Sequence, residues 1–160
     1  MPIATRSSKF DISKKKNLEK IISNILKKIK VGDAILLYGD LGVGKTTFAR
    51  ILINLLQKKN NLKVTEVPSP TFNIVHEYLI NNTLVAHYDL YRLSSKEECN
   101  DIGLNEDNNN KINIIEWPEK IQKKPINRFE LYLNYKNNFV SRSLKMKKYG
   151  RCKKYEIFKS

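Results

Sequence analysis

The residues best suited to chemistry lie in one short segment, Gly39-Asp-Leu-Gly-Val-Gly-Lys-Thr46. It matches the pattern G-x-x-x-x-G-K-[ST] in full, between a short apolar run and a stretch with helical spacing. Its glycines permit a tight loop whose backbone N–H groups converge on phosphate oxygens, and the positive end of the following helix points at the same oxygens. Lys45 is expected to reach the β- and γ-phosphates, Thr46 to ligate Mg²⁺ and Thr47 to hydrogen-bond the α-phosphate. The segment therefore predicts a site for ATP with Mg²⁺.

Two acids are suited to the other side of such a site. Asp89 follows the apolar alternation of residues 84–88, and Glu116 ends the apolar run of residues 112–115. A carboxylate at the end of a strand beside a phosphate loop holds Mg²⁺ or its waters, or polarises the attacking water. Taken singly, each acid fits a plain surface residue equally well.

The remaining motifs favour ATP hydrolysis over other reactions. A GTPase needs Asn-Lys-x-Asp for guanine, but the nearest match, Asn110-Lys-Ile-Asn113, ends in Asn and precedes a strand. A nucleotide kinase needs several arginines as phosphate clamps, yet only Arg50 and Arg92 lie between the loop and Trp117. Arg92 is the only candidate for an arginine finger, a group worth about 10³–10⁵ in rate, so we expect the isolated chain to hydrolyse ATP slowly.

Length and composition limit the possible fold class and cellular location of the protein. The 160 residues, 41% hydrophobic and 29% charged, predict one globular domain over residues 1–160. The sequence shows no apolar core of signal-peptide length at its start and no run long enough to cross a bilayer. Cys99 and Cys152 form no CxxC pair, so neither a disulfide framework nor a zinc site is indicated. We expect a cytoplasmic protein with no membrane or DNA partner.

The formal net charge of +14 is typical of proteins that bind nucleic acid. Lysines are spread through the whole chain, which favours solvated faces over a dedicated polyanion groove. The excess is densest in residues 136–160, a basic strand or hairpin region that fits RNA or an acidic partner and identifies neither. The sequence lacks an interleaving of aromatic and basic residues on a recognisable RNA-binding strand.

The elements that must position these residues follow from hydrophobic periodicity. Helical spacing predicts helices over residues 14–29, with Ser13 as N-cap, and 45–59, with a further helix starting at residues 94–98. Strands are predicted at residues 34–38, 64–67 and 112–115, in a hairpin of 72–79 with 84–88, and in the alternating tail from Phe129 to Ile157, where Gly150 is available for a turn. A polar loop is expected at residues 105–110. Together they predict an α/β sandwich with a mixed, partly antiparallel central sheet flanked by helices.

Four motifs in order carry a resemblance to a known family. They are the phosphate loop through Thr47, Ser69-Pro-Thr-Phe72, His87-Tyr-Asp-Leu-Tyr-Arg-Leu93 and Ile115-Glu-Trp-Pro-Glu119. Over residues 13–120 the chain resembles the TsaE (YjeE-type) family, the small P-loop ATPases of bacterial tRNA threonylcarbamoyladenosine synthesis. The last 40 residues match only in general character.

The resemblance implies a set of roles. It implies ATP and Mg²⁺ as cofactors, a TsaD–TsaB complex as partner, and contact with tRNA only through that complex, with hydrolysis acting as a switch. It implies catalytic roles for Thr71, Asp89 and Glu116 and metal ligation by Thr46 and Glu116. The residues expected to bind the nucleotide are Gly39, Asp40, Leu41, Gly42, Val43, Gly44, Lys45, Thr46, Thr47, Trp117 and Arg142, the last as a late basic residue near the nucleotide.

Simpler interpretations stand beside these roles. Trp117 fits core packing, His87 fits a satisfied, partly buried imidazole, and Phe72, Tyr88 and Tyr91 fit packing residues. Two other functions also stay open. One is a phosphotransferase acting on a small substrate, and the other is a basic RNA-binding module with a regulatory nucleotide site.

Overall fold

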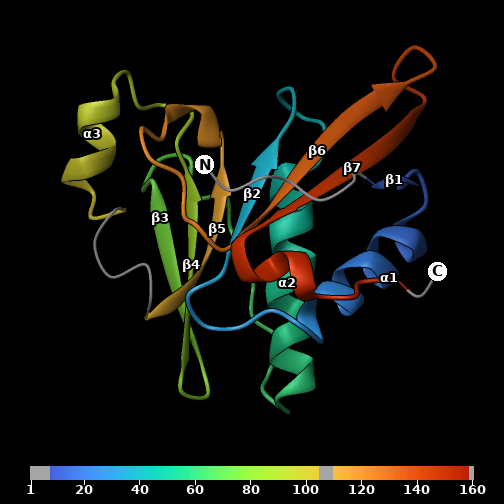
Figure 1. Ribbon diagram of the computed structural model, residues 1–160, viewed down its shortest axis with the longest axis horizontal. Coiled ribbons are helices and arrows are strands. Elements are labelled where there is room, and N and C mark those ends of the chain that lie inside the picture. The colour runs from blue at the N-terminus through green and yellow to red at the C-terminus, as the bar shows by residue number, and fades with distance from the viewer. Residues whose placement is uncertain (1–7, 105–109, 159–160) are drawn as a thin grey trace.

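The computed structural model describes residues 8–104 and 110–158, which build one seven-stranded sheet with helices on both faces (Figure 1). The helices are α1 (Lys15–Leu26), α2 (Lys45–Lys59) and α3 (Lys96–Asp101), with short 3₁₀ helices η1 (Pro118–Lys120) and η2 (Gly150–Lys154). The strands are β1 (Ser8–Asp11), β2 (Ala34–Tyr38), β3 (Val75–Ile80), β4 (Thr83–Asp89), β5 (Lys111–Glu116), β6 (Arg128–Lys136) and β7 (Ser141–Tyr149). The architecture is the mixed α/β sandwich that the sequence predicts.

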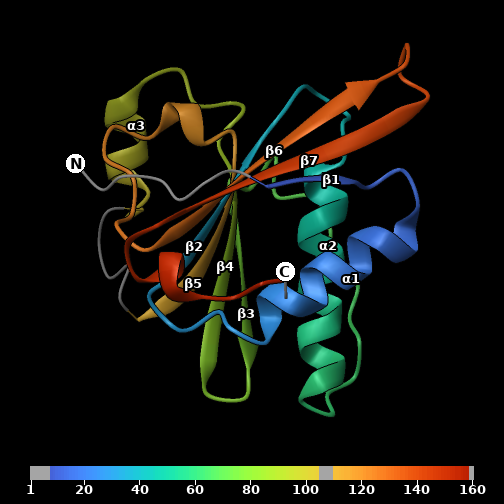
Figure 2. The ribbon, with the colours of Figure 1, turned by 45° about the vertical axis from the view of Figure 1, so that its right-hand side comes forward.

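The sheet has the strand order β1-β7-β6-β2-β5-β4-β3 (Figure 2). Its centre is parallel, because β2 pairs in parallel with β5 and β6, and β4 with β5. Its two flanks are the antiparallel pairs β3–β4, β6–β7 and β1–β7. The carboxyl ends of β2, β4 and β5 therefore meet at one edge, where ligands bind in open α/β sheets.

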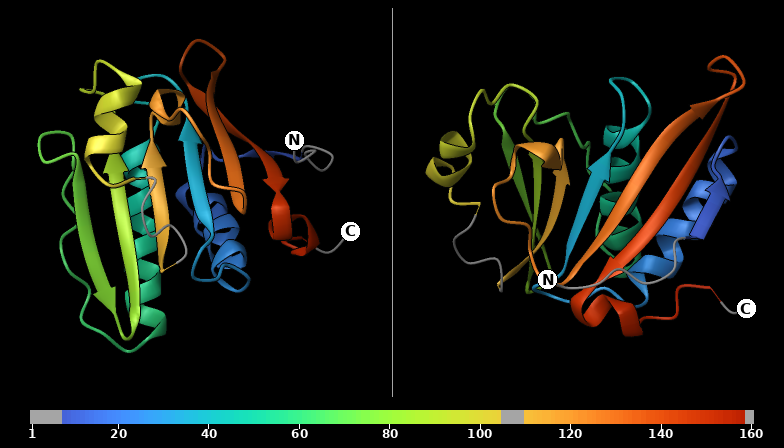
Figure 3. Two further views of the ribbon diagram at one scale, coloured as in Figure 1. Left: turned by 60° about the vertical axis from the view of Figure 1, so that its left-hand side comes forward. Right: turned by 45° about the horizontal axis from the view of Figure 1, so that its top comes forward.

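Two apolar clusters lie on opposite faces of the sheet. Figure 3 shows α1 and α2 on one face and α3 on the other. The larger packs α1 and α2, through residues such as Ile22, Ile25 and Leu52, against β2, β5, β6 and β7. The smaller packs residues of α3 and the segments around it against the outer face of β2, β4 and β5. The central strand β2 is buried on both sides, which explains its unbroken apolar sequence. In the described part of the chain, no helix combines the length and apolar character needed to cross a bilayer.

Ser13 is not the N-cap of α1. The helix begins at Lys15 after Lys14, without a side-chain cap bond, and it ends at Leu26, earlier than predicted. The Ser13 hydroxyl instead donates to the carbonyl of Arg142 at 3.3 Å and accepts from its N–H at 3.0 Å. The side chain therefore anchors the chain to β7, which competes with capping.

Two predicted strands are absent from the described part of the chain, and one strand was not predicted. Residues 64–67 form no strand, because the backbone N–H and hydroxyl of Thr65 bond to the Gln57 side chain at 3.2 and 2.8 Å. The tail past Gly150 is η2 followed by a coil, in which the Tyr155 hydroxyl donates to Asp33 at 2.9 Å. The short polar strand β1 was not predicted. The predicted polar loop at residues 105–110 lies outside the described residues except for Asn110.

Candidate nucleotide-binding site

The phosphate loop joins β2 to α2 at the carboxyl edge of the sheet. Gly39, Gly42 and Gly44 all have positive φ, at 147°, 79° and 118°. A Cβ on Gly39 would lie 2.6 Å from the Leu133 carbonyl oxygen, so this position excludes any side chain. Helix α2 follows Gly44 without a side-chain cap, which leaves its first-turn N–H groups for an anion.

Lys45 lies inside its own loop and is only 4% exposed. Its ammonium donates to the carbonyls of Gly39 and Asp40, the latter at 2.9 Å, and lies 4.1 Å from the centre of the Trp117 ring. Burial lowers the pKa of Lys45, and the negative charge of Glu116 opposes that shift most strongly. The site thus holds a desolvated cation next to carboxylates, where an incoming phosphate gains more from the charge than it would in water.

Glu116 is held by hydrogen bonds to both of its carboxylate oxygens. It ends β5 with 2% exposure, and its Oε2 accepts from the Thr46 hydroxyl at 3.0 Å. Its Oε1 accepts from Nε2–H of His87 at 2.8 Å. His87 comes from the adjacent strand β4 and is fully buried, more deeply than the sequence predicts, and its Nδ1 has no partner among the described residues. The imidazole therefore fixes the direction of the Glu116 carboxylate.

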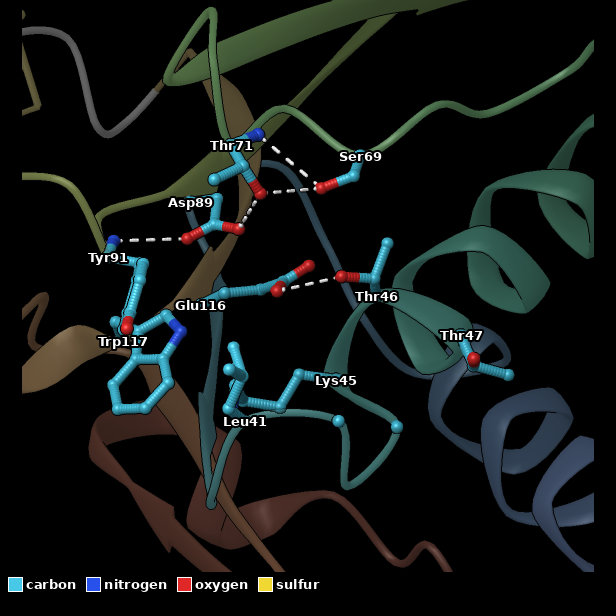
Figure 4. Close-up of a pocket in the computed structure, with 12 residues that line it drawn as sticks. Leu41, Lys45, Thr46, Thr47, Ser69, Thr71, Asp89, Tyr91, Glu116 and Trp117 are labelled. Carbon is cyan, nitrogen blue, oxygen red and sulfur yellow. Dashed lines mark hydrogen bonds between the residues drawn. The ribbon is translucent and has the colours of Figure 1, made fainter.

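Asp89 lies directly beside Glu116, because parallel pairing of β4 with β5 sets the two strand ends in register. The Thr71 hydroxyl donates to its Oδ2 at 2.7 Å, and the Tyr91 N–H donates to its Oδ1 at 3.0 Å. Ser69 bonds the same Thr71 hydroxyl at 2.7 Å (Figure 4). The Ser-Pro-Thr-Phe turn is thus tied to the sheet through one carboxylate.

These groups surround one cavity of about 340 Å³. It is lined by Leu41, Gly42, Gly44, Lys45, Thr46, Thr47, Ser69, Thr71, Asp89, Tyr91, Glu116 and Trp117. Of the predicted nucleotide residues, Gly39, Asp40, Val43 and Arg142 stand outside this lining, although the first three belong to the same loop. Arg142, on β7, has its Nη1 3.6 Å from the point that a Cβ on Gly44 would occupy. It is therefore next to the loop without lining the cavity.

Two residues of the lining, Ser69 and Tyr91, were not predicted as site residues. Both flank predicted ones in the quoted motifs, which is the signal that identifies them. Tyr91 rests against Trp117 with ring centres 5.0 Å apart, so it packs over the site and not in the core. Phe72 is 82% exposed, so its interpretation as a packing residue is wrong, whereas Tyr88 is buried in the core.

The oxygen atoms of Thr46 and Glu116 fit a magnesium ion. They converge within 3.0 Å at the end of the phosphate loop, and Mg²⁺ prefers such hard ligands. Among the described residues there is no group of three or more His, Cys, Asp or Glu suited to a metal.

The chain is similar to proteins of one family. The model of the family described as "Threonylcarbamoyl adenosine biosynthesis protein TsaE" matches residues 12–144. A protein of Rickettsia conorii named tRNA threonylcarbamoyladenosine biosynthesis protein TsaE is 38% identical over 69% of this chain and 61% of its own length. The protein of the same name from Haemophilus influenzae is 40% identical over 64% of each chain.

The match does not extend over the whole of every relative, since the chain spans under two thirds of the Rickettsia conorii and Rickettsia felis proteins. The fold is shared with the crystal structure of Bacillus subtilis YdiB, with a TM-score of 0.66 at 21% identity, covering 97% of this chain and 92% of that one. On the extent of the family match, the chain belongs to the TsaE family.

Proposed function

We propose that this protein is a slow, Mg²⁺-dependent ATPase that acts in tRNA threonylcarbamoyladenosine synthesis, as the names of its relatives indicate for them. The single observation that carries the proposal is the arrangement of Glu116. Its two oxygens bond Thr46 of the phosphate loop and the buried His87, so the acid is held in place for a metal–phosphate ligand.

The remaining residues supply complementary roles. The first-turn N–H groups of α2 and Lys45 bind the phosphates, and the Thr46 hydroxyl with Glu116 would hold Mg²⁺, which when bound neutralises charge on the β- and γ-phosphates. Asp89, with its Thr71 bond, is the group best placed to orient a water near the γ-phosphate. Trp117 and Tyr91 cover the cavity and limit water access.

Hydrolysis by the chain alone should be slow. Arg92 does not line the cavity; its guanidinium lies 5.4 Å from the Phe72 ring and donates to the Phe72 carbonyl at 3.4 Å. Without a finger the chain lacks a factor of about 10³–10⁵ in rate. We therefore assign hydrolysis the role of a switch on a TsaD–TsaB partner complex in the cytoplasm.

A small-substrate phosphotransferase receives less support. The cavity lining contains one lysine and no arginine, so it offers no second set of phosphate clamps. Such an enzyme would release ADP in response to a small substrate without protein partners.

The experiment is ATP hydrolysis by the purified chain, alone and with TsaD–TsaB, for the wild type, Lys45→Ala and Glu116→Ala. Lys58→Ala is the matched control, because Lys58 is an exposed lysine at the far end of α2. We expect slow hydrolysis that requires Lys45 and Glu116, changes when the pair is added and is unaffected in the control. Nucleotide binding without hydrolysis under either condition would contradict the proposal and leave a regulatory site.

A further inference from the structure

Strands β6, β7 and β1 carry a second feature, on the face of the sheet that points away from α1 and α2 (Figure 3, left). Phe129, Leu131 and Leu133 of β6 point into the core with those helices, so the alternate residues of β6 and their β7 partners point outward. We call this outward surface the open sheet face. It also includes Lys9 and Tyr38, which pair with Lys145 and Tyr132, and Lys124, which lies beside Glu130. Lys124 and the buried Arg128 both form ion pairs with Glu130. Among the described residues, the cations of this face that form no ion pair are Lys9, Lys136, Lys145 and Lys147, and its aromatic residues are Tyr38, Tyr132 and Tyr149.

Two acids, Glu130 and Asp11, lie among these cations. Glu130 is 2% exposed and accepts from the Tyr132 hydroxyl at 2.6 Å and from Arg128 Nε at 2.9 Å. Asp11, at the end of β1, accepts from the Ser13 N–H at 2.9 Å. Six cations against these two carboxylates leave the open sheet face with a net positive charge.

Lys9 and Lys145 are the clearest sign of a missing partner. They stand directly opposite each other in the β1–β7 ladder, where like charges are destabilising. Both are exposed, and neither has an acidic partner within the described part of the chain. Together with Lys136 they line a hollow of about 420 Å³ whose lining residues include no carboxylate. Such an arrangement suits an anion of phosphate size that relieves the repulsion.

The tyrosines favour a nucleic acid over an acidic protein as the partner of the open sheet face. The rings of Tyr38 and Tyr132 are stacked, with centres 4.6 Å apart and planes 11° apart. The Arg128 guanidinium lies 3.9 Å from the centre of the half-buried Tyr149 ring, and Lys147 lies 5.4 Å from that of Tyr132. The half-buried rings of Tyr132 and Tyr149 are planar groups of the kind on which nucleobases stack, whereas an acidic protein would need only the lysines.

We infer that the open sheet face binds RNA, with its lysines on the phosphates and its planar side chains against the bases. As the sequence predicts, no single strand interleaves aromatic and basic residues, but the sheet brings residues of both kinds together from the neighbouring strands β1-β7-β6-β2. This inference goes beyond the proposed function and does not depend on ATP hydrolysis.

The test is fluorescence anisotropy of an unmodified tRNA transcript, titrated with protein at several KCl concentrations. The variant Lys9→Glu/Lys145→Glu is compared with Lys27→Glu/Lys28→Glu, which makes the same charge change at exposed positions after α1. We expect the first variant to weaken binding at least about tenfold and to lower the slope of log K against log salt by about two. The second should bind within about twofold of the wild type, and all three should hydrolyse ATP equally.

Several results would overturn the inference. Equal losses in both variants would show general attraction to a basic protein, and no loss in either would show that RNA binds elsewhere or not at all. Binding of poly-glutamate with the same dependence on Lys9 and Lys145, but no binding of RNA, would assign the face to an acidic protein. If the reversals disturb folding by circular dichroism, Lys9→Gln/Lys145→Gln provides the neutral version, for which a smaller loss is expected.

Discussion

Replacing His87 with leucine should separate a positioning role from a structural one. The change removes the bond from Nε2–H to Glu116 Oε1, and a bond to a charged group contributes about 1.5–3 kcal/mol. It also removes the buried Nδ1, which has no partner among the described residues, and an unpaired buried polar atom costs about 1–3 kcal/mol. The two effects oppose each other, but the 2% exposed Glu116 also loses the donor to its Oε1, so we expect a net loss of about 1–3 kcal/mol in the free energy of unfolding.

The same change should be costly for the metal–nucleotide complex. Glu116 keeps its bond to Thr46 but loses the constraint on its other oxygen, and losing a residue that orients a ligand typically costs about 10–100-fold in metal affinity. The assay is calorimetric binding of a non-hydrolysable ATP analogue with Mg²⁺ and with EDTA, beside urea unfolding. The ratio of the two affinities should fall by about that factor, with the EDTA value unchanged.

His87→Gln is the matched control, because its amide still offers a donor to Glu116 and should restore part of the ratio. A loss of more than about 3 kcal/mol of stability with an unchanged affinity ratio would refute the reasoning and make His87 a purely structural residue.

Other consequences can be checked by denaturation. Gly39→Ala should destabilise the fold by at least about 2 kcal/mol in urea, because the new Cβ would lie 2.6 Å from the Leu133 carbonyl oxygen. Ser95→Ala should cost about 1 kcal/mol, since the Ser95 hydroxyl caps α3 by accepting from a backbone N–H; an unchanged thermal midpoint would argue against that cap. Burial raises the pKa of Cys152 from 9.0 to about 12 and that of Tyr155 from 10.0 to about 12. Folding thus favours the neutral forms of both groups. Their contribution to the free energy of unfolding should be fully present below pH 9 and should be lost as the pH rises from 9 to 12, and this loss should be smaller in Cys152→Ala.

The parts of the site that depend on local spacing were predictable. The phosphate loop, its flanking strand and its helix all follow from residues close together in sequence, and the structure has them at residues 34–59 as predicted. The placement of Asp89 next to Glu116 is different, because it depends on the register of β4 against β5. The local sequence pattern predicts only that each acid lies at the end of its strand, and it does not predict how the two strands pair. Only the resemblance to the family motifs predicted that the two acids belong to one site.

Two of the wrong predictions have a common cause in side-chain bonds to another element. Residues 64–67 have the composition of a strand, but the Gln57 side chain takes the Thr65 backbone out of any ladder. Ser13 has the right type and position for a cap, but Arg142 on β7 engages its hydroxyl. Both competitors lie on elements whose proximity no local pattern indicates. Propensity was therefore overruled by tertiary bonds that it cannot anticipate.

The open sheet face was hidden from sequence analysis for the same reason, and its position has a consequence. Lys9, Lys145 and Tyr38 belong to three strands, and only the order β1-β7-β6-β2 brings them onto one surface. Tyr38 stacks on Tyr132 of that face and is also the last residue of β2, directly before Gly39 of the phosphate loop. RNA on the open sheet face would therefore contact the strand that carries the nucleotide site. Since any energetic coupling between two ligands is reciprocal, bound nucleotide should change RNA affinity by the same factor as RNA changes nucleotide affinity.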